Sequence, residues 1–72
     1  MMAIITNVTA WSDPRQNANG DEVLAYYYAT CDDDGNPVDG RCHVCTTRAE
    51  AVRLGARLAT SLNVEFLNET LR

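Results

Sequence analysis

Residues 47–63 read TRAEAVRLGARLATSLN, and this stretch decides the fold. Its first four residues have the spacing of a capping box, in which the Thr47 hydroxyl accepts from the Glu50 amide and the Glu50 side chain reaches back to the cap. Apolar residues then recur on one side of a helix, and charged residues gather on the other. Asn63 is suited to a left-handed stop. The sequence therefore predicts an amphipathic helix over residues 48–62.

The apolar side of this helix is built mostly from Ala, Gly and Leu, with Gly55 near its centre. A glycine inside a helix costs about 1 kcal/mol relative to alanine. Its position on the buried side predicts that the helix backbone closely approaches a sheet.

Two loops rich in turn-forming residues divide the chain before the helix, at residues 12–21 and 32–40. The first contains a Pro and an Asn-Gly pair, and the second combines Asp, Gly, Asn and Pro, which favours chain reversal. The segments on either side of these loops are composed of residues typical of strands. They predict strands over residues 3–10, 22–31 and 41–46.

The expected fold is a single small α+β domain over residues 1–72, with an antiparallel three-stranded sheet and one helix packed on one face. Residues 64–67 either add a fourth, edge strand or close the core beneath the helix. A chain of this length gains only about 3–5 kcal/mol from its core. Self-association as a homodimer, a metal or a partner would therefore add stability.

Both faces of the second predicted strand carry aromatic side chains. Strand alternation places Tyr26 and Tyr28 on one face and Tyr27 on the other. One helix covers one face of such a sheet, so the opposite face is exposed or packs against another molecule. We take Tyr26 and Tyr28 as candidate partner-binding residues. The alternative is that either Tyr lies under a loop with its hydroxyl in water.

The loop at residues 32–40 is strongly acidic and contains Asp32, Asp33, Asp34 and Asp39. The pattern fails as a calcium loop, because no bidentate Glu stands at its end. A solvated hairpin tip is one interpretation. The other is a partner-binding surface that meets Arg residues of a protein or mimics the phosphate spacing of a nucleic acid. These four residues complete the set of candidate contacts.

The chain contains three thiols and one imidazole, from Cys31, Cys42, His43 and Cys45. That number of ligands matches a structural zinc site, so a zinc-stabilised module is an alternative. In a strand, however, Cys42 and Cys45 point to opposite faces, and zinc needs ligands that converge. A Cys/His pair without an oxyanion hole or an orienting carboxylate does not indicate catalysis. We expect no metal, no cofactor and no enzymatic activity.

The stretch from Tyr26 to Leu58 resembles the hairpin-helix unit of the AP2-like arm-binding domains of phage integrases. The resemblance rests on a strand, the Asp34-Gly35 turn, a second strand and the helix start at residues 47–51. It implies a three-stranded sheet backed by one helix, with the sheet reading DNA. In this sequence the hairpin is acidic, with Arg41 as its cation. The basic residues available for nucleic acid lie instead on the helix: Arg48, Arg53 and Arg57.

In size and acidity the chain is similar to small phage and mobile-element proteins that include anti-CRISPRs. Its formal net charge is −4, which repels phosphate and disfavours direct nucleic-acid binding. This similarity implies a stoichiometric inhibitor that binds a host nucleic-acid-handling complex. Residues 1–5 have no cationic leader, and no apolar run approaches the length of a membrane span. We therefore expect a cytoplasmic protein-binding module.

Overall fold

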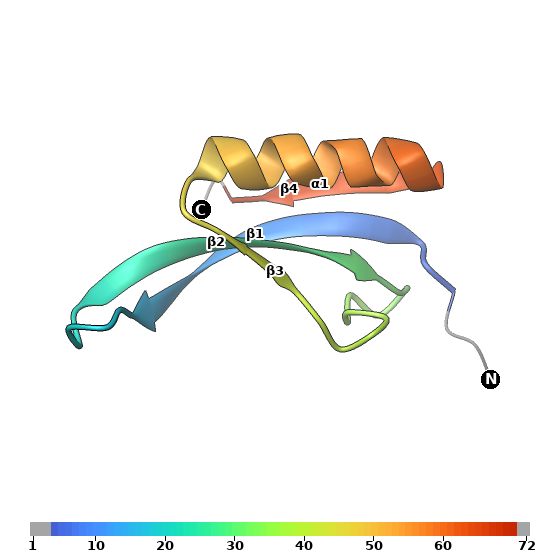
Figure 1. Ribbon diagram of the computed structural model, residues 1–72. Helices are drawn as coiled ribbons and strands as arrows, with labels where there is room; N and C mark the ends of the chain where they lie inside the picture. Colours follow the sequence, from blue (N-terminus) through green and yellow to red (C-terminus); the bar gives the residue numbers. More distant parts are fainter. Residues whose placement is uncertain (1–3, 71–72) are drawn as a thin grey trace.

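The computed structural model describes residues 4–70 and shows an α+β fold with one helix packed on a four-stranded sheet (Figure 1). The strand order is β3-β2-β1-β4. The pairs β1/β2 and β2/β3 are antiparallel, and β4 runs parallel to β1. The elements are β1 (Asn7–Gln16), β2 (Glu22–Cys31), β3 (His43–Cys45), α1 (Arg48–Leu62) and β4 (Glu65–Glu69). Within the described residues, no helix is long and apolar enough to cross a membrane.

The helix has both predicted ends. The Thr47 hydroxyl accepts a hydrogen bond from the Glu50 amide at 3.2 Å, which satisfies one of the open donors of the first turn. At the other end, Asn63 adopts the left-handed conformation with φ 57° and ψ 45°. The Val64 amide then donates to the Ala59 carbonyl at 3.0 Å and closes the last turn.

Strand β2 has the predicted bounds, whereas the prediction for β1 was wrong at both ends: residues 4–6 are not in a strand, and the strand extends beyond Ala10. Strand β1 begins at Asn7 and continues through the predicted loop to Gln16; Ala3, where the prediction began, lies outside the described residues. Each residue from Ser12 to Gln16 pairs with β2, and β4 does not extend this far. Pro14 has no N–H to donate. It is tolerated here because this part of β1 has a neighbouring strand on one side only.

Strand β3 has three residues instead of the predicted six. Arg41 belongs to the preceding turn, where its amide donates to the Asp39 carboxylate at 3.0 Å. At the other end, Thr46 leaves the strand because the helix begins at its cap, Thr47.

The sheet is mixed, which corrects the expectation of an antiparallel sheet. Residues 65–67 of the predicted segment 64–67 lie in β4, so the fourth strand is present. Helix α1 carries the chain across the sheet from the β3 edge to the opposite edge (Figure 1). Such a helical crossover connects strands that run in the same direction, and β3 and β4 both run parallel to β1.

Small residues form the contact between α1 and the sheet. Ala51, Gly55 and Ala59 are the buried residues of the helix. A Cβ atom on Gly55 would lie 2.7 Å from Phe66 Cε1 and 3.4 Å from Tyr28 Cβ. The predicted close approach of the helix backbone to the sheet is thus confirmed.

Candidate functional site

The two predicted contact tyrosines lie on the face that the helix covers. Tyr28 packs beneath Gly55, and the Arg48 guanidinium lies 5.7 Å from the centre of the Tyr26 ring. Both rings are half-buried. A partner that approached the uncovered face would not meet Tyr26 or Tyr28 first, because α1 lies on their side of the sheet.

The surroundings of Tyr28 are those of a packed structural residue. Its ring stacks on His43 with a centroid distance of 4.6 Å. Burial raises the pKa of Tyr28, with further increases from Cys45 and Glu50. Burial and the neighbouring Glu50 carboxylate also raise the pKa of the Cys45 thiol, whereas Arg53 lowers it. A thiol that holds its proton is a poor nucleophile, so this cluster lacks the usual mark of a reactive cysteine.

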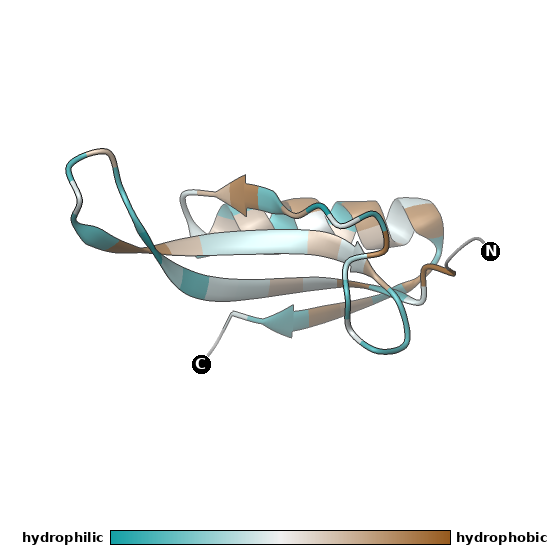
Figure 2. Cartoon of the chain, turned by 90° about the horizontal axis from the view of Figure 1, so that it is seen from below, coloured by the Kyte–Doolittle hydropathy of each residue, from teal (hydrophilic) through white to brown (hydrophobic). Residues whose placement is uncertain are grey.

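The uncovered side of the sheet, here called the open face, has an aromatic pair at its centre. We define it by Thr9, Trp11, Tyr27, Val44 and Leu67; Ala25, Ala29 and Cys31 lie on the same side of β2 and are buried. Trp11 and Tyr27 are cross-strand partners whose rings stack at 5.6 Å, with an angle of 19° between their planes. Both are half-buried, and Val44 is 51% exposed. Figure 2 views this side and shows pale strands between hydrophilic loops at the two ends.

Trp11 is the functional candidate that sequence reasoning missed. It stands one residue beyond the predicted end of the first strand. The available signal was the spacing around the Asn19-Gly20 turn, which brings Trp11 opposite Tyr27 when the hairpin is extended.

Acidic side chains surround the open face. Asp13, Glu65 and Glu69 project from the same side of β1 and β4 as Trp11. The loop after β2 and the tip of the β1/β2 hairpin both bend away from α1 (Figure 1). This loop brings the predicted acidic cluster to the open side. Arg15 and Arg41 are cations on this side of the molecule.

The acidic loop is held by its own carboxylates. The Asp32 side chain accepts hydrogen bonds from the amides of Asp34 and Asn36, each at 3.0 Å. Asp33 and Asp34 are exposed. Asp32 therefore shapes the loop, while its two neighbours present charge to solvent.

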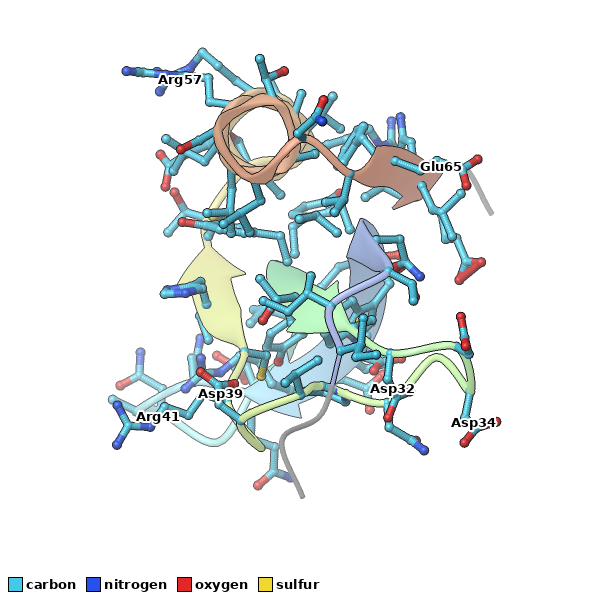
Figure 3. All side chains as sticks on the ribbon, turned by 90° about the vertical axis from the view of Figure 1, so that its right-hand side faces the viewer. Asp32, Asp34, Asp39, Arg41, Arg57 and Glu65 are labelled. Carbon is cyan, nitrogen blue, oxygen red and sulfur yellow. The ribbon has the colours of Figure 1, made fainter. Side chains whose placement is uncertain are left out.

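Helix α1 has a positive net charge, from three Arg side chains against the single carboxylate of Glu50. Arg48, Arg53 and Arg57 are all exposed. In Figure 3, Arg57 lies beside α1 at one end of the molecule, and Asp32 and Asp34 lie at the other. The chain is thus polarised, with an acidic open side and a basic helix.

The thiols do not converge on one point. Cys31 lies on the open side of β2, whereas Cys45 pairs with Tyr26 and faces the helix. Cys42 is exposed, and all three are free thiols. Among residues 4–70 there is no group of three or more His, Cys, Asp or Glu side chains placed to hold a metal ion.

Comparisons with protein-family models, with curated proteins and with solved structures find no match for this chain.

Proposed function

We propose that the chain is a non-catalytic protein-binding module whose open face docks on a basic surface of a partner protein. The stacked pair of Trp11 and Tyr27 inside an acidic surround carries this proposal. Aromatic side chains are enriched among the residues that dominate binding energy at protein interfaces. The surrounding carboxylates steer a basic partner and disfavour an acidic one.

The specific target we propose is a host nucleic-acid-handling complex. Proteins that bind nucleic acid present clustered Lys and Arg to phosphate, and an acidic face is complementary to such clusters. The module would act stoichiometrically, by covering that surface, as its resemblance in size and acidity to small phage inhibitors implies. Such a role requires no catalytic residue.

A nucleic-acid-binding module is the second candidate, and the exposed Arg48, Arg53 and Arg57 of α1 favour it. In that function the helix would meet phosphate. The AP2-like resemblance instead implies that the sheet reads DNA, but in this chain acidic side chains surround the open face of the sheet. Phosphate binding by a few Arg side chains weakens steeply as salt rises, whereas a contact centred on aromatic rings weakens less.

Affinity capture from a bacterial lysate, with and without nuclease, tests the proposal. Retention of a protein complex that resists nuclease and is lost in a Trp11→Ser variant supports it. An Arg57→Ser variant is the matched control, because it alters the opposite side of the molecule and should retain the complex. Capture of nucleic acid alone, lost with Arg57→Ser and kept with Trp11→Ser, would overturn the proposal in favour of the second candidate.

A further inference from the structure

Strand β2 is much longer than the strand beside it. β2 has ten residues, whereas β3 pairs only with Tyr26–Tyr28. The chain turns away from the direction of β3 at Thr46, because Thr47 caps the helix. In the described part of the chain, residues 22–25 of β2 therefore pair with β1 on one side and with no strand on the other. We call the vacant position beside residues 22–25 the β3 lane.

A groove follows this lane. It has a volume of about 450 Å³, and the residues that line it include Arg15, Val23, Leu24, Val44 and Thr46. Three of the exposed large apolar side chains lie here, with exposed fractions of 40% for Val23, 50% for Leu24 and 51% for Val44. Val23 and Leu24 point to opposite sides of the sheet, so both sides of the lane are apolar.

We propose that the β3 lane binds an extended segment of a partner protein by strand addition, antiparallel to β2. Main-chain hydrogen bonds to the free edge would supply affinity, and side-chain contacts would supply specificity. Because both sides of the lane are apolar, the segment carries apolar residues at consecutive positions.

Charge at one end of the lane defines the segment further. Asp21 and Glu22 are both exposed at the hairpin tip, next to the groove, whereas Arg15 lines the groove from the other side of the sheet, the side of its partner Val23. A segment that runs antiparallel to β2 reaches them with its C-terminal end, so Lys or Arg belongs there. A second copy of the chain fits less well, because pairing two β2 edges brings two acidic tips to one short lane. The lane also adjoins the open face through Val44, so a single partner could occupy both.

The probe is the peptide acetyl-Thr-Val-Ile-Val-Lys-Lys-amide, titrated into the ¹⁵N-labelled full chain. We expect shifts and slowed amide exchange at residues 22–25 and 44–46. A peptide with N-methyl groups on alternate residues should bind about tenfold more weakly or worse, because it cannot pair with a strand edge. If about 1 mM peptide produced no chemical-shift changes, or if the methylated peptide bound equally well, the proposal would be overturned.

Two exposed leucines give a matched pair of variants. Leu24→Glu should weaken peptide binding by about tenfold or more, whereas Leu62→Glu, at the far end of α1, should leave it unchanged. A concentration-dependent dimer in sedimentation, dissociated by Leu24→Glu, would instead assign the lane to a second copy and overturn the proposal.

Discussion

Gly55 stands directly over Phe66: a Cβ atom at Gly55 would lie 2.7 Å from Phe66 Cε1. Gly55→Ala raises helix propensity by about 1 kcal/mol. Forcing the methyl group against the ring costs about 1–3 kcal/mol. We therefore expect Gly55→Ala to lower the free energy of unfolding by about 1 kcal/mol in urea denaturation, although alanine is the better helix former.

The Phe66 ring gives this prediction its control. In a Phe66→Leu background the methyl group meets a smaller side chain, so Gly55→Ala should be neutral or stabilising there. A stabilising effect of Gly55→Ala in the unmodified chain would show that the helix does not approach β4 this closely.

The helix cap provides a second test. The Thr47 hydroxyl accepts from the Glu50 amide, and loss of such a cap costs about 1 kcal/mol. Thr47→Ala should lower the denaturation midpoint accordingly. Thr46→Ala removes a neighbouring exposed hydroxyl and should change stability by less than about 0.5 kcal/mol. Equal effects of the two substitutions would contradict the assigned cap.

Alkaline pH should destabilise the fold through Cys45. Burial and then the Glu50 carboxylate raise the pKa of this thiol, so the folded chain keeps the proton to higher pH than the unfolded chain. The resulting stability is fully present below the ordinary thiol pKa, about 8.5, and is lost as pH rises through the raised folded pKa. Cys45→Ala should flatten the alkaline decline in unfolding free energy, measured by urea denaturation from pH 7 to 10. Cys42→Ala, at an exposed thiol, should not, and identical slopes would reject this explanation.

In the acidic loop, one aspartate holds the loop conformation and its two neighbours carry the exposed charge. Asp32→Ala removes an acceptor of two amide hydrogen bonds and should cost about 1 kcal/mol in stability. The double variant Asp33→Asn, Asp34→Asn should leave stability within about 0.5 kcal/mol. It should nevertheless weaken partner binding, more strongly at low salt than at high salt. Unchanged affinity for the captured partner at low salt would remove this loop from the interface.

The sequence predicts the elements whose limits are set locally. Helix α1 begins and ends where Thr47 and Asn63 supply the cap and the left-handed stop. Strand β1 was predicted to end at Ala10, because Ser12 to Pro14 are common in turns. It continues because each of these residues pairs with β2, a cross-strand contact that local propensity does not report.

The site depends on which face the helix covers, and the alternation pattern leaves that undecided. Tyr28 on one face and Tyr27 on the other are equally good candidates for the core. The contact of Gly55 with Tyr28 and Phe66 selects the covered face, and it joins residues far apart in the chain. Tyr27 and its partner Trp11 are consequently left on the open face.

The most direct test of the open-face proposal is the dissociation constant of the captured partner for Tyr27→Ser and Arg57→Ser, measured side by side by calorimetry. Circular dichroism and thermal unfolding first establish that both variants are folded. We predict that Tyr27→Ser weakens binding by about tenfold or more and that Arg57→Ser leaves it unchanged. Normal binding by Tyr27→Ser together with loss in Arg57→Ser would place the contact on the helix and contradict the account.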